Sequence, residues 1–279
     1  AQSFAAEAGA LFLPPFDAED IIEGQATCAL EVLDEMGAAP DLMVLPVGGG
    51  GLSSGTVQVL AEMAPGARML LAEPVGAPSL KAALAAGAPV TLEKVDSFVD
   101  GAAVARIGER NFAALAAVDP GDVLLAPEDR LCATISELLN IEGMVLEPAG
   151  ALSIDVLRDV EGLGGKRVVA VVSGGNFDFE RLPEVKERAL RWEGRKKYYI
   201  LRMPQRPGAL KDFLGVLGPE DDIARFEYLK KSARNFGSVL IGIETRGRSD
   251  FGALEARMSA AGFTWLDITD DTVITNLIV

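Results

Sequence analysis

The chain has 279 residues, of which 49% are hydrophobic and 24% are charged, and its formal net charge is −15. This length and composition allow one large or two ordinary globular domains and exclude a disordered chain. A surface this acidic repels nucleic acid and anionic lipid, so we expect neither as a partner. The sequence contains no histidine. Ser-His-Asp and Cys-His catalysis and imidazole-ligated metals are therefore excluded.

Strand-like and helix-like runs alternate over the first two thirds of the chain, beginning with the apolar run LMVLPV at residues 42–47. The predicted strands are 42–47, 68–73, 123–126 and 167–172, and the predicted helices are 52–64, 78–86, 127–140 and 149–159. Such alternation predicts an α/β fold with a mostly parallel sheet. Cys28 and Cys132 lie in apolar-periodic stretches, which predicts buried thiols in a reducing cytoplasm, with a disulfide as the alternative.

The composition changes near Gly194, after a predicted helix over residues 180–192. Residues 1–193 hold 13 Lys and Arg against 30 Asp and Glu, whereas residues 194–279 hold 13 against 11. The two segments thus have net charges of −17 and +2. This shift, at the polar junction RWEGRKK, predicts a domain boundary between residues 193 and 194.

The last part of the chain predicts a second, α+β domain. Its predicted strands are 198–203, 223–230, 237–244 and 264–268, and its predicted helices are 207–217 and 251–261. This order, βαββαβ, is the ferredoxin-like plan.

The most informative motif is VGGGGL at residues 47–52, which follows a buried strand and opens a helix. Glycines let the backbone turn sharply and approach a ligand closely, and their N–H groups can converge on an anion at the positive end of the helix. The dinucleotide fingerprint and the P-loop do not fit, because no glycine stands at the third fingerprint position and no lysine follows the glycines. The motif therefore predicts an anion site, and the alternative is a bare strand-to-helix turn.

A second loop holds the same position in its own strand unit. Ser173 begins the sequence SGGN directly after the predicted strand 167–172, so it would face the same crevice as the glycines. Its hydroxyl could donate a hydrogen bond to a ring nitrogen, and the alternative is an ordinary polar turn.

These motifs together resemble the threonine dehydratase (threonine ammonia-lyase) family of pyridoxal-phosphate enzymes. The matching stretches, in order, are PPFDAEDIIEGQATCALE, PVGGGGL, LAEP, EPAGALS and VVSGGNF, and they extend over nearly all of residues 1–193. The βαββαβ tail with its PGAL opening resembles the ACT-like amino-acid-sensing domain of biosynthetic dehydratases. The resemblance implies a fold-type II pyridoxal-phosphate catalytic domain and a C-terminal ferredoxin-like regulatory domain.

The resemblance also implies functional residues. The cofactor phosphate would be held by backbone N–H groups of Gly48, Gly49, Gly50, Gly51 and Leu52. Ser173 would bond the pyridine nitrogen and leave it unprotonated, which favours β-elimination. Glu73 corresponds to a cation ligand in related racemases and dehydratases, although Ser79 stands where a second carboxylate is expected; a capping or surface carboxylate is the alternative. Pro207, Gly208 and Leu210 are the implied effector-binding residues.

One family motif has no counterpart. The family forms its Schiff base on a lysine in an S-x-K-x-R-G-A motif that precedes the glycines, and nothing in this sequence matches it. Lys81 follows Ser79 and Leu80, but it lies after the glycines and is interpreted as part of a solvated helix face. We therefore identify no catalytic residue and expect the chain to be the C-terminal portion of a dehydratase, inactive and self-associating when alone.

The implied function is conversion of L-threonine to 2-oxobutanoate and ammonia in isoleucine biosynthesis, with isoleucine as feedback effector and valine as a possible antagonist. The resemblance further implies a cytoplasmic homo-oligomer, a tetramer in the intact protein. Two alternatives stay open: a non-catalytic amino-acid-binding or assembly fragment, and a serine dehydratase or racemase that uses the same glycine motif.

Overall fold

The structure is a computed structural model, and it describes residues 1–229 and 236–271. The chain forms two compact units, residues 1–178 and 179–279. The division lies before helix α8 (Leu182–Trp192). The domain boundary at 193–194 stays a prediction, and Lys230 of the predicted strand 223–230 lies outside the described residues.

The first unit is built on a four-stranded parallel sheet with the order β3-β2-β1-β4. Its strands are β1 (Leu42–Pro46), β2 (Arg68–Pro74), β3 (Val123–Ala126) and β4 (Val168–Ala170). The predicted parallel α/β sheet is confirmed, although β4 is shorter than expected. Every residue of β1 is buried, as is typical of a central parallel strand covered by helices on both faces.

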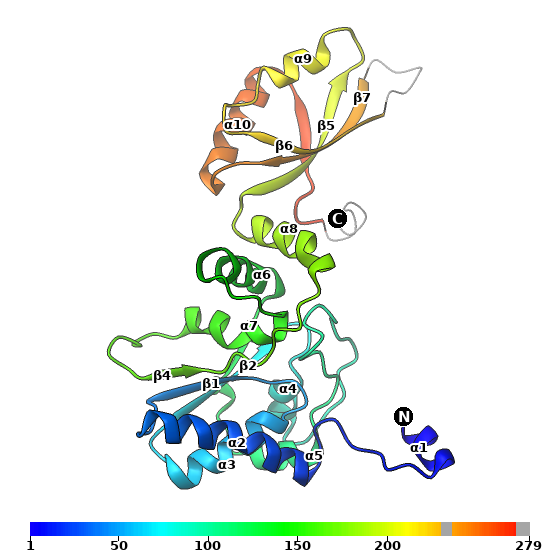
Figure 1. The fold of residues 1–279 in the computed structure, drawn as a ribbon. Coiled ribbons are helices and arrows are strands. Elements are labelled where there is room, and N and C mark those ends of the chain that lie inside the picture. The colour runs from blue at the N-terminus through cyan, green and yellow to red at the C-terminus, as the bar shows by residue number, and fades with distance from the viewer. Residues whose placement is uncertain (230–235, 272–279) are drawn as a thin grey trace. The chain divides into compact units, whose positions relative to one another are not determined.

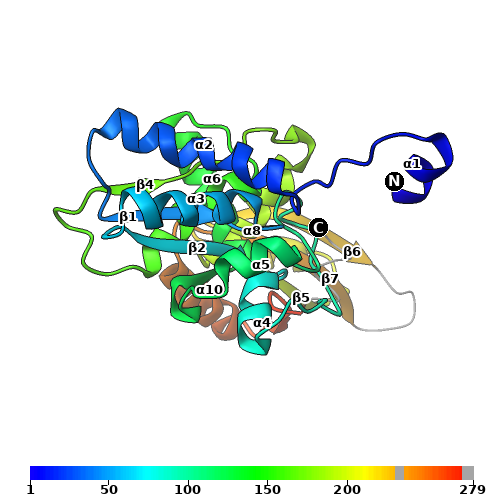
Figure 2. The same cartoon turned by 90° about the horizontal axis from the view of Figure 1, so that it is seen from below.

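Helices cover both faces of this sheet (Figures 1 and 2). On one face, α2 (Glu19–Met36) lies against α3 (Gly51–Met63), while α6 (Glu128–Glu137) and α7 (Pro148–Asp155) cover the other. Short π and 3₁₀ segments extend α6 and α7, namely Leu138–Glu142 and Val156–Asp159. The remaining helices are α1 (Gln2–Ala8), at the end of an extended arm, α4 (Ser79–Ala86) and α5 (Glu109–Leu115).

A buried ion pair joins α6 to α7. The Asp155 carboxylate is fully buried, lies 2.7 Å from Arg130 Nη2 and accepts a 2.7 Å hydrogen bond from Thr134 Oγ1. Arg130 also binds Asp159. The two partners therefore satisfy a charge that would be costly to bury alone.

The second unit is an antiparallel sheet with two helices on one face. Its elements after α8 are β5 (Lys196–Pro204), α9 (Ala209–Leu214), β6 (Asp222–Leu229), β7 (Phe236–Glu244), α10 (Arg248–Ala260) and β8 (Thr264–Asp267). The strand order is β6-β7-β5-β8, which confirms the ferredoxin-like βαββαβ plan. Phe213 of α9 and Phe251 of α10 pack into a core with Tyr199 and Ile241 of the sheet.

Two neighbouring lysines on β5 link the sheet to its helices. Lys196 Nζ binds Glu187 of α8 at 2.5 Å and Glu244 of β7 at 3.0 Å. Lys197 Nζ binds Glu255 of α10 at 2.9 Å. Burial and hydrogen bonding to Glu255 raise the pKa of Tyr199, so this phenol stays protonated.

No described helix is both long and apolar enough to cross a membrane.

The α2–α3 contact depends on a glycine. A Cβ added to Gly55 would lie 2.5 Å from the carbonyl oxygen of Ile22 and 2.7 Å from the backbone nitrogen of Ala26, both on α2. Only a residue without a side chain allows the two helices to approach so closely.

We predict opposite effects for two glycine-to-alanine substitutions in this helix pair. Gly55→Ala should lower the free energy of unfolding by about 1–3 kcal/mol, because the new methyl group overpacks the contact. Gly24→Ala, on α2, meets nothing within 4 Å and should raise it by roughly 0.5–1 kcal/mol. Urea denaturation of both variants measures this, and equal effects would contradict the close packing at Gly55.

Candidate functional site

The glycine motif forms a tight turn between β1 and α3. The strand ends at Pro46 and the helix begins at Gly51. The first intrahelical bond runs from Ser54 N to Gly50 O at 2.9 Å. The backbone N–H groups of the preceding helical residues therefore lack intrahelical acceptors and form the positive end of the helix.

Two glycines of the turn are required by the local geometry. Gly50 has φ = 93°, in the left-handed region that favours glycine. A Cβ added to Gly49 would lie 2.1 Å from the ring of Phe16, so this ring lies directly on the backbone of the turn. A side chain at either position would therefore clash with neighbouring residues or strain the backbone, so the turn keeps this close packing only with glycine.

Asn111 ties the turn to its neighbours. This fully buried residue of α5 donates from Nδ2 to Gly49 O at 2.7 Å and to Phe16 O at 3.1 Å. The carboxylate of Asp17 accepts hydrogen bonds from the backbone N–H groups of Glu109 and Arg110 at 3.0 and 2.9 Å, at the start of α5. Hydrogen bonds therefore connect the glycine turn, the segment around Phe16 and helix α5.

Two loops complete the surroundings of the turn. A Cβ added to Gly48 would lie 3.1 Å from Ala102 Cα, so the loop that contains Ala102 approaches the turn closely. On the other side, β4 pairs in parallel with β1, with Ala170 beside Val44. Continued by three residues, the same register places Ser173 beside Val47, at the entrance to the turn.

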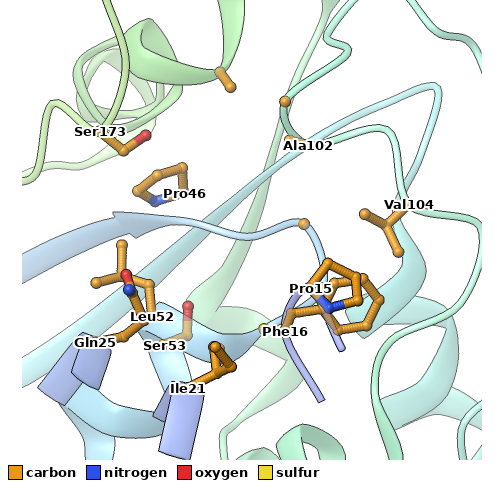
Figure 3. Close-up of a pocket in the computed structure, with 16 residues that line it drawn as sticks. Pro15, Phe16, Ile21, Gln25, Pro46, Leu52, Ser53, Ala102, Val104 and Ser173 are labelled. Carbon is orange, nitrogen blue, oxygen red and sulfur yellow. The ribbon is translucent and has the colours of Figure 1, made fainter. Parts of the chain in front are cut away.

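These elements enclose a cavity of about 470 Å³ (Figure 3). Its lining residues are Pro15, Phe16, Ile21, Gln25, Pro46, Gly48, Gly49, Gly50, Gly51, Leu52, Ser53, Gly101, Ala102, Val104, Ala149 and Ser173. The structure thus brings together the five predicted phosphate-binding residues and Ser173. None of the lining side chains is ionisable, so the polar groups that line the cavity are backbone groups, the hydroxyls of Ser53 and Ser173 and the carboxamide of Gln25.

The structure adds residues that the sequence did not single out as site residues. Phe16, Asn111 and the loop at Ala102 shape the turn, yet they lie 33 to 62 positions from Gly49 in the sequence. The only sequence signal was the PPFD stretch, which contains Phe16. Lys81 lies outside the cavity lining and donates from Nζ to Val123 O at 2.8 Å, so it is half-buried rather than fully solvated.

Glu73 lies away from the cavity, at the start of α4. Its fully buried carboxylate accepts hydrogen bonds from the backbone N–H groups of Leu80 and Lys81 at 2.7 and 3.0 Å, and so caps this helix. Burial raises the pKa of Glu73 to about 7, although these hydrogen bonds oppose the rise. The described residues contain no group of three Cys, Asp or Glu arranged to hold a metal. The cation role of Glu73 stays a prediction.

The predicted effector residues lie in the loop between β5 and α9. Gly208 precedes α9 with φ = 84°, and Pro207 and Leu210 are exposed. Beside this loop is a cavity of about 210 Å³. Its lining residues are Pro204, Arg206, Ala209, Asp212, Ala261, Gly262 and Phe263, so the predicted residues border the cavity without lining it.

Comparison with known proteins matches both units to described families. Residues 1–174 match a family described as pyridoxal-phosphate dependent enzyme, and residues 187–278 match the C-terminal regulatory domain of threonine dehydratase. Biosynthetic L-threonine dehydratases are similar over most of this chain. The protein from Bacillus subtilis is 45% identical to this chain. The aligned region covers 96% of this chain and 64% of the Bacillus subtilis protein. The protein from Lactococcus lactis is 39% identical over 100% of this chain and 68% of its own length.

Solved structures show the same likeness. Threonine deaminase isoform 2 from Solanum lycopersicum, in its processed form, has a TM-score of 0.62 at 32% identity, over 68% of this chain and 55% of that chain. Maize serine racemase has a TM-score of 0.59 at 27% identity, over 66% and 58%. The chain spans about two thirds or less of the length of most of these relatives. It belongs to the biosynthetic threonine dehydratase family of pyridoxal-phosphate-dependent enzymes.

Proposed function

We propose that this chain is the cofactor-anchoring and regulatory portion of a threonine dehydratase that converts L-threonine to 2-oxobutanoate and ammonia for isoleucine biosynthesis. The observation that carries the proposal is the combination of the glycine cavity with a ferredoxin-like unit on one chain. The identity to biosynthetic L-threonine dehydratases, 39–48% over 90–100% of this chain, supports the same activity.

In this proposal the residues of the turn bind the cofactor phosphate. The N–H groups of Gly48 to Leu52 would donate to its oxygens, and the positive end of α3 favours the negative charge. Ser173, on the other side of the cavity in Figure 3, would donate its hydroxyl to the pyridine nitrogen. When bound, pyridoxal phosphate supplies the electron sink for the elimination. A neutral hydroxyl at Ser173 leaves the ring nitrogen unprotonated.

We further propose that turnover requires a lysine that this chain does not supply. Residues 1–178, all of which the structure describes, contain three lysines, Lys81, Lys94 and Lys166. None of these side chains lines the cavity.

Large apolar side chains are also exposed on the N-terminal arm, with Leu11 84% and Leu13 73% exposed. Exposed apolar groups of this kind mark surfaces that bury against other chain segments, and they support self-association of the chain when alone.

The alternatives make different predictions about the two units. A serine dehydratase or racemase is favoured by the similarity to maize serine racemase, but the match of residues 187–278 to a threonine dehydratase regulatory domain favours threonine as substrate. A non-catalytic fragment would bind amino acids without a cofactor. The cytoplasmic location and the homo-oligomeric state, a tetramer in the intact protein, stay predictions from the family resemblance.

The first experiment measures cofactor binding and turnover by the purified chain. 4′-Deoxypyridoxine 5′-phosphate is the suitable ligand because it has no aldehyde to react with surface lysines. We expect wild-type protein to bind it. Gly49→Ala should weaken binding by about tenfold or more, because the methyl group displaces Phe16 and opens the turn.

Gly164→Ala is the matched control, since a Cβ there meets nothing within 4 Å and its φ is not left-handed. With pyridoxal phosphate, the chain should release no 2-oxobutanoate from threonine. Equal binding by Gly49→Ala and wild type would refute binding at the glycine turn. Turnover by the chain alone would show that it contains the required lysine.

We also propose that the 210 Å³ cavity of the second unit binds isoleucine. Arg206 and Asp212 form an exposed ion pair at 2.6 Å, and these charges complement the carboxylate and ammonium groups of an amino acid. Phe263 and Ala209 provide an apolar wall for its side chain. The neighbouring loop residues Pro207, Gly208 and Leu210 would close over the ligand.

Isoleucine should therefore raise the melting temperature of this unit, because a ligand that binds only the folded state stabilises it by about 2.7 kcal/mol at 100 times its dissociation constant. Arg206→Ala removes an exposed side chain and should abolish the shift without lowering the melting temperature of the ligand-free protein. Differential scanning calorimetry with isoleucine, valine and aspartate tests this. The absence of a shift with any branched amino acid would count against the proposed regulation.

A further inference from the structure

Ser53 is the third residue of α3 and has a hydroxyl group without a protein partner. The residue is fully buried and lines the 470 Å³ cavity. Among the described residues, no protein atom hydrogen-bonds its Oγ. Buried polar atoms are nearly always hydrogen-bonded, so this hydroxyl requires an explanation.

The usual acceptors for a helical serine are already engaged. A serine in a helix can donate to the carbonyl three or four residues earlier, here Gly50 O or Gly49 O. Gly49 O accepts from Asn111 Nδ2 and from the backbone of Gly108, and Gly50 O accepts from the backbone of Ser54. Ser54 itself donates its hydroxyl to Asn111 O at 3.2 Å. Of the two adjacent serines, Ser53 alone faces the cavity.

The Ser53 side chain is directed into the same cavity that the glycine turn lines. Side chains of an α-helix tilt toward its N-terminus, so a residue in the first turn leans toward the space beyond the helix end. Figure 3 shows the Ser53 oxygen directed from α3 into the cavity, between Leu52 and Phe16. Gly51 and Leu52 line the same cavity, and their N–H groups lack intrahelical acceptors.

We propose that Ser53 is a side-chain ligand for a phosphate monoester in this turn, and that its hydroxyl donates to a phosphate oxygen beside the backbone N–H groups. This inference rests on the proposed binding of the cofactor phosphate and adds a specific residue to it. No lysine or arginine lines the cavity, so an anion there would be recognised by uncharged donors, namely backbone N–H groups, hydroxyls and the Gln25 carboxamide. Hydrogen bonds from a hydroxyl to an anionic oxygen are short and strong compared with those between neutral groups.

The test compares two ligands that differ only in the phosphate. Isothermal titration calorimetry measures 4′-deoxypyridoxine 5′-phosphate and 4′-deoxypyridoxine against wild type and Ser53→Ala. We expect Ser53→Ala to weaken binding of the phosphorylated ligand by about tenfold or more and to leave the affinity for the unphosphorylated ligand unchanged. Inorganic phosphate should compete less effectively for the variant than for wild type.

Thr56→Val is the control. Thr56 Oγ1 is also buried without a partner among the described residues, but Thr56 does not line the cavity. Loss of the Thr56 hydroxyl should leave the affinities for the phosphorylated and the unphosphorylated ligand unchanged. Without ligand, Ser53→Ala should be at least as stable as wild type, because the substitution removes an unsatisfied buried hydroxyl. A purely structural role would instead lower the stability of Ser53→Ala.

The outcomes separate the two proposals. If wild type prefers the phosphorylated ligand and Ser53→Ala retains the full preference, the role of Ser53 is wrong and the glycine turn still binds phosphate. If wild type shows no preference for the phosphorylated ligand, both the turn and Ser53 are refuted as phosphate ligands. An equal loss of affinity in Thr56→Val would also overturn the assignment to Ser53.

Discussion

The hydrogen bond from Asn111 Nδ2 to Gly49 O, 2.7 Å long, is the interaction on which the site depends. A turn of consecutive glycines has many accessible conformations and loses much entropy when it is fixed. The Asn111 carboxamide holds the turn to α5 and also binds Phe16 O, while the Phe16 ring packs directly against Gly49. The N–H groups at the start of α3 are therefore oriented before any ligand arrives. Preorganisation of this kind reduces the free-energy cost of binding.

The parallel sheet positions the rest of the cavity around this turn. Because β1 and β4 run side by side in the same direction, the residues after both strands emerge at the same edge, and Ser173 lies opposite the glycines. The second unit is organised differently. There the acidic residues Glu187 and Glu255 on the flanking helices bind two adjacent lysines of β5, and apolar side chains fill the remaining interface. Its cavity has an exposed ion pair at its rim, which suits a zwitterion, whereas the cavity of the first unit is lined by uncharged groups.

The sequence predicted those features that depend on local pattern. Apolar runs identified all four strands of the first sheet, and the glycine motif identified the start of α3 and one wall of the cavity. The short helix α5 was missed, because its position is stabilised by Asp17 and Asn111 through contacts 92 to 95 residues apart in the sequence. Glu73 could not be assigned for a similar reason: its carboxylate caps a helix after a turn, and only coordinates show which N–H groups it faces. Ser53 was overlooked because two successive serines are an ordinary helix beginning, and their different partners appear only in three dimensions. Cys132 is buried as expected, whereas Cys28 is only half-buried.

The central claim is that the backbone of residues 48–51 binds phosphate. It is tested most directly by the amide signals of the protein labelled with ¹⁵N-glycine, recorded as 4′-deoxypyridoxine 5′-phosphate is added. We expect large shifts for Gly48, Gly49, Gly50 and Gly51 and unchanged signals for the glycines of residues 179–279, because only the first group lines the cavity. Unshifted signals for these four glycines, or shifts confined to other glycines, would contradict it.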